Sequence, residues 1–181
     1  MLLGHNFDSE SGFQNSLQRG KAKLTSGTWG SLIELLGAAE VPLAHCFFTN
    51  AFMGLCAGSN SFDYHGRDND RFRTACSSFL KAQIELQRPR LIVTLGLHVP
   101  PMLAEVSSDL SAWSGLRLRL KDIDATPMIS AEFLLNDAIH RATVVAIAHP
   151  SLPNGSRRTP KGFSPGKQGE IELLRAGWAQ S

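Results

Sequence analysis

Four short runs of apolar residues recur along the chain, and each of them ends in a polar or glycine-containing turn. They cover residues 2–4, 46–50, 91–96 and 144–150. Within these runs the hydrophobic residues are continuous and do not alternate with polar ones, a pattern typical of strands buried on both faces of a parallel sheet. The pattern therefore predicts four parallel strands in the interior of the protein.

Between these runs, apolar residues recur at the three- and four-residue spacing of amphipathic helices. The longest such segment spans Asp70–Gln87 and is closed by Pro89. Further helices are expected over residues 28–39, 102–106 and 169–178, and an amphipathic strand over residues 116–123. Alternating strands and helices predict an α/β fold with three layers, α/β/α, in which helices cover both faces of a central four-stranded parallel sheet.

The composition is that of one ordinary cytoplasmic domain. The chain has 181 residues, 43% of them hydrophobic, which is enough for one core and predicts a single domain over residues 1–181. Residues 1–3 are too short for a secretory signal, and no apolar run reaches the roughly 18 residues of a membrane-spanning helix. The three cysteines show no CxxC spacing and indicate free thiols in a reducing compartment. We expect a cytoplasmic monomer without a membrane partner.

The charge of the chain permits a polyanionic partner without demanding one, because the formal net charge is only +2. Basic residues gather in two places, residues 19–23 and residues 157–167, and the second place is rich in proline, glycine and serine. Such clusters are typical of a solvated surface as well as of a surface that contacts phosphates. The sequence leaves both interpretations open.

Polar residues of chemical interest follow the predicted strands directly. Gly4-His5-Asn6-Phe7-Asp8 comes after the first run, Asn50 ends the second, and His149-Pro150-Ser151 ends the fourth. Each motif occurs by chance in many proteins, so their order and placement are the signal. Because ligands of parallel sheets bind beyond the carboxyl ends of the strands, these residues predict a site at that edge of the sheet.

In this order the motifs resemble those of the uracil-DNA glycosylase superfamily. In that superfamily the first-strand loop reads Gly-x-Asp/Asn-Pro or Gly-Glu-x-Pro-Gly, the second strand ends in Asn, and the last strand opens into His-Pro-Ser. The stretch Phe48-Thr49-Asn50-Ala51 and residues 75–96 look like the iron–sulfur branch. The resemblance implies hydrolysis of the N-glycosidic bond of uracil, or of a related damaged base, with DNA containing that base as the partner.

The sequence also departs from the superfamily pattern. The first loop lacks the proline, and Asn6 stands where the mismatch-specific thymine/uracil branch carries Asn, in place of a carboxylate. Cys56 and Cys76 look like two cluster ligands, but three cysteines cannot supply four thiolates, and no His/Cys spacing fits a zinc site. We therefore expect neither a metal nor an organic cofactor.

Two alternatives to the glycosylase remain. A catalytically weak or inactive module with the same fold could bind nucleobases or nucleic acid, and the unusual first loop keeps this reading open. A thiol enzyme is less well supported, because none of the cysteines lies visibly at a helix start or beside a base.

The resemblance assigns chemical roles to the residues at the strand ends. Asn50 would pair with O4 and N3–H of uracil, and His149 would donate a hydrogen bond to the base as negative charge develops on it. Asn6 would hold the attacking water through its carbonyl oxygen, but an amide cannot accept the proton of that water. Excision should therefore be slow. Asp8 is the nearest carboxylate able to act as a base, unless it is simply a turn residue.

Neighbouring residues would complete the substrate pocket. Gly4, His5 and Ser151 belong to the same motifs and are expected to line it. Either Phe7 or Phe13 would stack on the flipped base, and Phe7 is favoured because it lies in the loop itself. Each phenylalanine could equally be a local packing residue.

Two further positions are candidates for contact with DNA. His65 matches the loop histidine that becomes joined to the sugar in one branch, but the basic residues around it are absent, and an exposed loop histidine is the alternative. Leu152, Arg157 and Arg158 follow His149 in a loop that enters the duplex in related enzymes. Leu152 would act as a wedge and the arginines would bind phosphates, unless this is a disordered basic loop.

Overall fold

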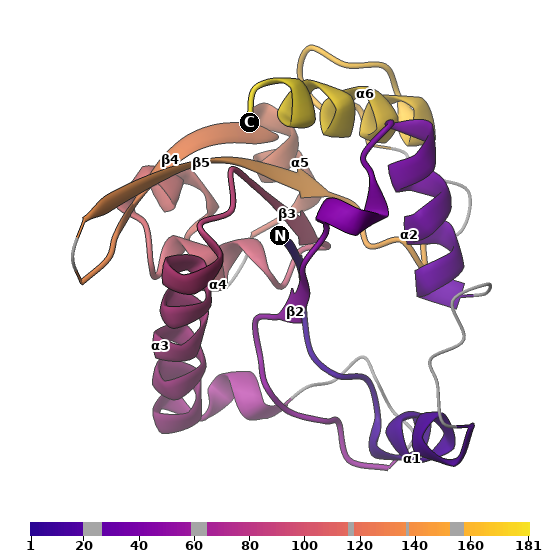
Figure 1. Cartoon of the computed structure of the whole chain (residues 1–181), viewed down its shortest axis with the longest axis vertical. Coiled ribbons are helices and arrows are strands. Elements are labelled where there is room, and N and C mark those ends of the chain that lie inside the picture. The colour runs from indigo at the N-terminus through magenta and orange to yellow at the C-terminus, as the bar shows by residue number, and fades with distance from the viewer. Residues whose placement is uncertain (20–26, 59–64, 116–117, 137, 153–157) are drawn as a thin grey trace.

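A five-stranded, mostly parallel sheet forms the centre of the molecule (Figure 1). The computed structural model describes residues 1–19, 27–58, 65–115, 118–136, 138–152 and 158–181, with the side chains at positions 65 and 67 excepted. The strand order is β2-β1-β3-β5-β4, and β4 alone pairs antiparallel within this described sheet. The strands are β1 (Leu2–Gly4), β2 (Phe48–Asn50), β3 (Leu91–Leu95), β4 (Met128–Leu134) and β5 (Ile139–Ile147).

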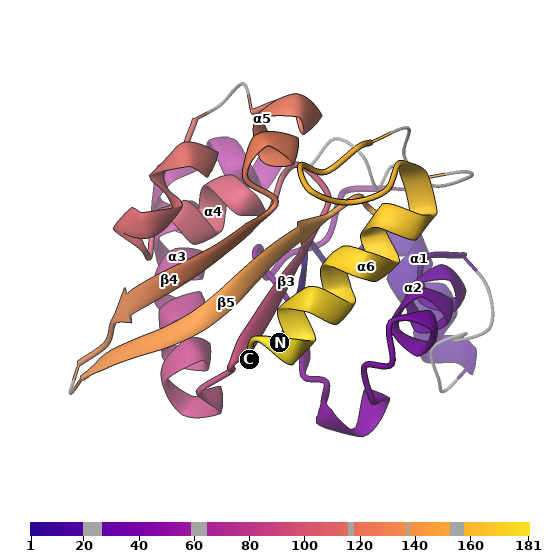
Figure 2. The same cartoon turned by 90° about the horizontal axis from the view of Figure 1, so that it is seen from above.

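Helices cover both faces of this sheet (Figure 2). One face carries α2 (Gly27–Ala38) and α6 (Gly166–Ala179). The other carries α3 (Asp70–Gln87), α4 (Pro100–Ala104), η3 (Ser108–Trp113) and α5 (Leu120–Ala125). The shorter elements η1 (Leu43–His45) and η2 (His65–Asp68) lie in connections, and α1 (Glu10–Arg19) lies beyond the end of the sheet (Figure 1). The predicted arrangement of helices around a parallel sheet is therefore present.

The strands are buried on both faces, which explains their continuous hydrophobic runs. Ile92 and Val144 belong to the core cluster beneath α3 and α4, whereas Val93 and Val145 belong to the cluster beneath α2 and α6. Successive residues of a strand point to opposite faces, so a strand in the middle of a three-layer fold needs apolar side chains at every position.

The predicted helix over residues 70–87 is confirmed at both ends. Asn69 caps the first turn, because its side chain accepts a hydrogen bond from the Phe72 N–H. At the other end Arg88 adopts the left-handed conformation with φ 45°, and Pro89 follows it. The other predicted helices correspond to α2, α4 and α6 with small shifts at their ends.

Two predictions about the segment before β5 are wrong. The sheet has a fifth strand, β4, and residues 120–125 form the helix α5 where an amphipathic strand was expected over residues 116–123; residues 116 and 117 lie outside the described part. β4 is an edge strand with polar positions at Ser130 and Glu132, so it lacks the continuous apolar run of the inner strands. Its edge is covered at Glu132, whose N–H donates to Asp109 and whose carbonyl accepts from Ser107.

The structure also bears on the expected free thiols and on the expected absence of a membrane-spanning helix. The three cysteines are not joined in disulfides. In the described part of the chain, no helix combines the length and the apolar character that crossing a bilayer requires.

The contact between α6 and the sheet generates a stability prediction. A Cβ atom on Gly177 would lie 2.6 Å from Val145 Cγ2, whereas a Cβ atom on Gly37 in α2 would meet nothing within 4 Å. Gly177→Ala should therefore lower the free energy of unfolding by about 1 to 3 kcal/mol through overpacking. Gly37→Ala should leave it unchanged or raise it by up to about 1 kcal/mol, because alanine favours helix. Urea unfolding of both variants measures this, and equal effects would contradict the close packing of α6.

Candidate active site

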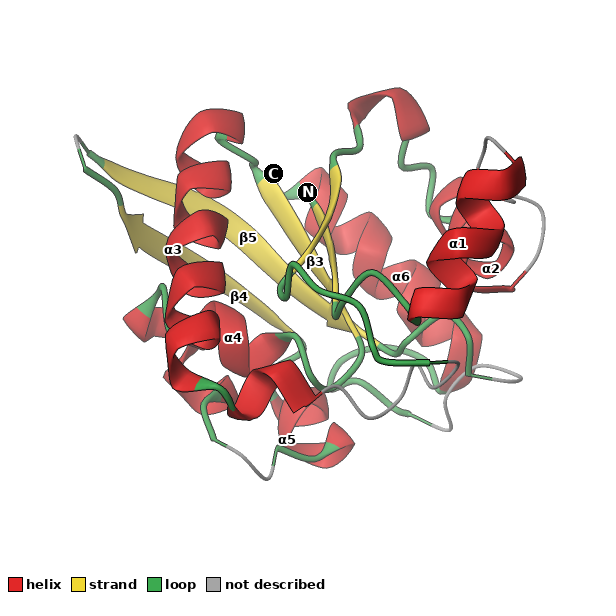
Figure 3. Ribbon diagram, turned by 90° about the horizontal axis from the view of Figure 1, so that it is seen from below, coloured by secondary structure: helices red, strands yellow, loops and turns green. Residues whose placement is uncertain are grey.

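The carboxyl ends of the four parallel strands meet at one edge of the sheet. β1 lies between β2 and β3, so the chain leaves β1 toward one neighbour and later returns on its other side. In α/β proteins, ligands bind beyond the strand ends at such a reversal of direction. The loops that follow the strands are drawn in green in Figure 3.

Asn50 and Gly4 lie in direct register at this edge, because they are paired residues of β2 and β1. A Cβ atom on residue 4 would lie 2.5 Å from Asn50 Oδ1, so any larger residue there would displace the Asn50 side chain. Beyond the strands the pairing continues, since Ala51 N–H donates to Gly4 O at 2.8 Å and Phe52 N–H to His5 O at 2.9 Å. The first loop is thereby fixed against the end of β2, with Asn50 beside it.

The side-chain amide of Asn6 is oriented by two hydrogen bonds that its nitrogen donates. Nδ2 donates to the Asp8 carbonyl at 3.2 Å and to Cys56 Sγ at 3.3 Å. Both of these bonds use the amide nitrogen, which leaves the carbonyl oxygen Oδ1 as the group that can accept a hydrogen bond from a ligand or water.

Asp8 has the features of a turn residue. Its φ is +83°, in the left-handed region that few residues other than glycine adopt. Its carboxylate occupies the space that a Cβ atom on Gly12 would need, in the first turns of α1. The carboxylate therefore lies against the first turns of α1.

His149 follows β5 and has a defined tautomer. Its Nδ1 lies 2.7 Å from Ser151 Oγ and 3.3 Å from the Ser151 backbone nitrogen. Because a backbone N–H can only donate, Nδ1 must accept, and we assign the proton of the neutral ring to Nε2. Burial and, to a smaller extent, the charge of His98 lower the pKa of His149 below its ordinary value. The ring thus presents a neutral Nε2–H donor, and Ser151 orients it.

His98, in the loop after β3, joins the site although no sequence motif marked it. Its ring centroid lies 5.0 Å from that of His5, which in turn packs edge-on against Phe52 at 5.5 Å. The same loop supports His149, because Gly96 has φ +83° and a Cβ atom there would lie 3.1 Å from His149 Cβ. The strand-end rule pointed to this loop, and the position of His98 two residues after Gly96 was the available signal.

The aromatic candidates differ in placement. Phe7 lies in the first loop, where its backbone N–H donates to Gly54 O at 3.1 Å, and its side chain is 47% exposed. Phe13 is also exposed but lies on α1. His65 begins η2, and its side chain lies outside the described part of the structure.

The residues after His149 divide into an exposed and a buried group. Leu152 is 46% exposed, and its N–H donates to His149 O at 3.0 Å in a tight turn. Arg157 lies outside the described residues. The expectation that Arg158 contacts phosphates is wrong, because its side chain is only 1% exposed and is ion-paired with Asp124 and Glu170.

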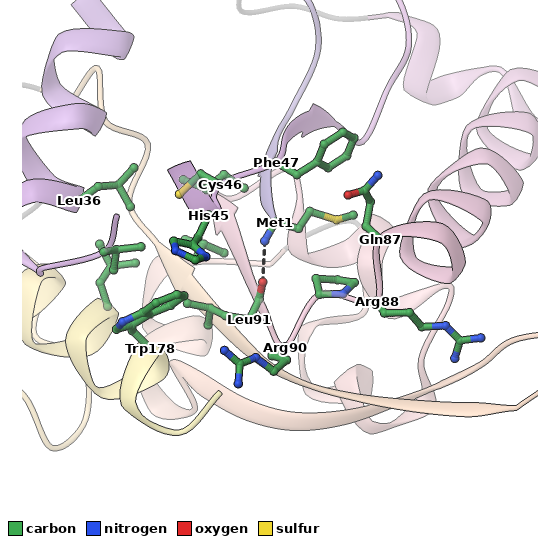
Figure 4. A pocket seen from close by; sticks show the side chains of 15 residues that line it. Met1, Leu36, His45, Cys46, Phe47, Gln87, Arg88, Arg90, Leu91 and Trp178 are labelled. Carbon is green, nitrogen blue, oxygen red and sulfur yellow. Dashed lines mark hydrogen bonds between the residues drawn. The ribbon is translucent and has the colours of Figure 1, made fainter. Parts of the chain in front are cut away.

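A cavity of about 210 Å³ lies at the opposite edge of the sheet, near the first residues of β1 and β3 (Figure 4). The amino group of Met1 donates to Leu91 O at 2.7 Å beside it, and the rings of His45 and Trp178 lie 6.1 Å apart. No residue of the strand-end motifs lines this cavity. We assign the candidate active site to the carboxyl edge, since the chemically suited side chains follow the strand ends there.

Within the described residues, no three His, Cys, Asp or Glu side chains are grouped so that they could hold a metal ion. Comparison of the sequence with protein-family models and with curated proteins finds no match. The interpretation of the site therefore rests on its own residues and their geometry.

The surroundings of His149 generate a pH prediction. We expect its ring to titrate below the ordinary value near 6.5, and His98→Gln to raise its pKa part of the way back, because burial remains. Since the folded pKa is lowered, the unfolded chain binds more protons, and stability should fall as the pH drops below about 6.5. An NMR titration of the imidazole measures the pKa; an unchanged value in His98→Gln would show that the two rings do not interact.

Proposed function

We propose that the protein is a DNA glycosylase that hydrolyses the N-glycosidic bond of uracil, or of a related damaged base, in DNA. The observation that carries this proposal is the presence of three different polar groups at one edge of the sheet, each after a separate strand. Asn50 contributes an amide, Asn6 a carbonyl acceptor and His149 a neutral N–H donor. Excision of a flipped base needs all three: a group that hydrogen-bonds to its Watson–Crick edge, a group that positions the attacking water, and a donor that stabilises the negative charge developing on the base.

Asn50 would select the base. Its amide offers one acceptor and two donors, which match N3–H and O4 of uracil, whereas cytosine presents the opposite pattern. The exposed ring of Phe7, in the adjacent loop, is the favoured surface for stacking. Gly4, beside Asn50, leaves room for the Asn50 side chain to lie against the backbone.

His149 would stabilise the leaving group. Cleavage of the N-glycosidic bond places positive charge on the sugar and negative charge on the departing base. A donor held in place before the reaction stabilises such charge without reorganisation. The Ser151 N–H, by holding Nδ1 as an acceptor, keeps the Nε2 proton directed to the base.

Asn6 would position the water through Oδ1 but cannot accept its proton. The proton must pass to solvent or to another group, so we expect excision to be slower than in enzymes with a carboxylate at this place. The position of Asp8 against α1 makes it a poor second candidate for the base.

The same observation favours a second candidate function, a module that binds nucleobases or nucleic acid without cleaving them. Such a module would use the Asn50 amide to bind the base, and it fits the fact that Asn6, in the proposed water-binding position, cannot accept a proton. Binding of uracil-containing DNA without release of free uracil would distinguish it. For the glycosylase we propose a cytoplasmic monomer acting on DNA, which is consistent with cysteines that form no disulfides.

Uracil excision tests the proposal. Purified protein is incubated with single- and double-stranded oligonucleotides that contain one uracil, and abasic sites are cleaved with alkali. We expect slow excision, and a loss of about a hundredfold or more in His149→Ala, the scale of removing one preorganised donor. His45→Ala, a histidine change at the opposite edge, is the control and should match the wild type. Wild-type excision by His149→Ala would remove this residue from the mechanism.

The exposed Leu152 next to His149 generates a prediction about duplex DNA. If this side chain fills the space left by the flipped nucleotide, Leu152→Ala should reduce excision from a duplex much more than excision from a single strand. The physical reason is that only the duplex requires the base to be levered out of a stack. Parallel rates on both substrates measure the difference; an equal reduction on both would exclude the wedge.

A further inference from the structure

A buried ion network lies directly behind the candidate site. The guanidinium of Arg158 binds Asp124 of α5, with Nε to Oδ1 at 2.6 Å, and Glu170 of α6, with Nη1 to Oε1 at 3.2 Å. It also donates through Nη2 to the Ala146 carbonyl of β5 at 3.0 Å. Arg158 therefore connects two helices with the strand that leads to His149.

Glu170 extends this network to the residue before His149. Its carboxylate is 5% exposed, and both oxygens lie 3.3 Å from the Ala148 nitrogen, whose N–H they accept. On the other side of the strand, Gly96 N–H donates to Ile147 O at 2.9 Å. The backbone that carries the imidazole is thus held by a charged acceptor on one side and by β3 on the other.

The network also closes the loop that begins at His149. Arg158 stands at the far end of that loop, yet its side chain binds Ala146 at the near end. Its own carbonyl accepts from Gly166 N–H at 2.7 Å, which ties the loop to the start of α6. A change at Arg158 or Glu170 would therefore be transmitted to the turn at residues 149–152.

We infer that Glu170 is a positioning residue for His149: by holding the Ala148 N–H, and being held itself by Arg158, it fixes the direction of the His149 ring. The catalytic consequence rests on the proposed glycosylase function, but the effect on the ring does not. Buried ion networks contribute little net stability compared with apolar side chains of the same size. They do fix geometry, and a shift of about 1 Å at a reacting group can cost about a hundredfold in rate.

The inference is tested first on the ring itself. Glu170→Met removes the acceptor, and the paired change Glu170→Met with Arg158→Met leaves no unpaired arginine. Asp124 then loses its partner, but its side chain is 18% exposed and can be hydrated, so the paired variant should remain folded. Glu172→Met, two residues along α6, is the matched control, because the hydrogen bonds of Glu172 within the described residues go to Ser164 and Gln168 and not to β5. Imidazole ¹⁵N shifts of His149 at pH 8 report the tautomer, and amide exchange reports the Ala148 N–H.

In the wild type and in Glu172→Met we expect one tautomer, protonated on Nε2, and a protected Ala148 amide. In the paired variant we expect a mixture of tautomers and at least about tenfold faster exchange of Ala148. Glu170→Gln retains an oxygen for the Ala148 N–H and should restore the single tautomer. A folded paired variant with one tautomer and a protected Ala148 amide would overturn the inference.

Kinetics separate this inference from the proposed function. If the wild type excises uracil, the paired variant should lower kcat about tenfold or more with little change in KM, because only the donor geometry changes. An equal loss in Glu172→Met would attribute the effect to α6 in general and contradict the inference. If the wild type releases no uracil, the proposed function fails, and the ¹⁵N shifts still decide the role of Glu170.

Discussion

The parallel hydrogen bonding of β1 to both β2 and β3 is the constraint on which the site depends. β1 is short and buried on both faces, so it has no room for polar side chains until Gly4, where the strand ends. Because its two neighbours run in the same direction, their polar residues also appear at this end. Asn50, Asn6 and the His98 loop are therefore brought together by the topology, although they are far apart in the sequence.

Electrostatics then give each polar group one role. The Asn6 amide nitrogen donates two hydrogen bonds within the protein, which leaves its carbonyl oxygen as an acceptor. The His149 Nδ1 atom accepts from the Ser151 N–H, which leaves its Nε2–H as a donor. Burial and the nearby His98 favour the neutral form of His149, and the Arg158 network secures the backbone behind it. The carboxylates of that network are ion-paired with Arg158, so the polar groups after the strand ends are amides and an imidazole.

The sequence alone predicts the elements whose signal is local. Continuous apolar runs mark β1, β3 and the end of β5, and apolar residues at helical spacing, closed by Pro89, mark α3. β4 has no continuous apolar run, because an edge strand is only half buried, and the sequence therefore did not predict it. Arg158 was misjudged because its proline- and glycine-rich surroundings resemble a surface loop, while its partners lie 34 and 12 residues away. His98 could not be predicted because its packing against His5 and its electrostatic effect on His149 arise only in the folded chain.

The location of base binding tests the central claim most directly. Free uracil is titrated into ¹⁵N-labelled protein, and amide and side-chain shifts are followed by NMR, with cytosine as the comparison. The account predicts that uracil shifts the signals of Asn50, Ser151 and the His149 ring at the carboxyl edge, and that cytosine has a smaller effect. Shifts confined to His45 and Trp178, at the cavity on the opposite edge, would contradict it.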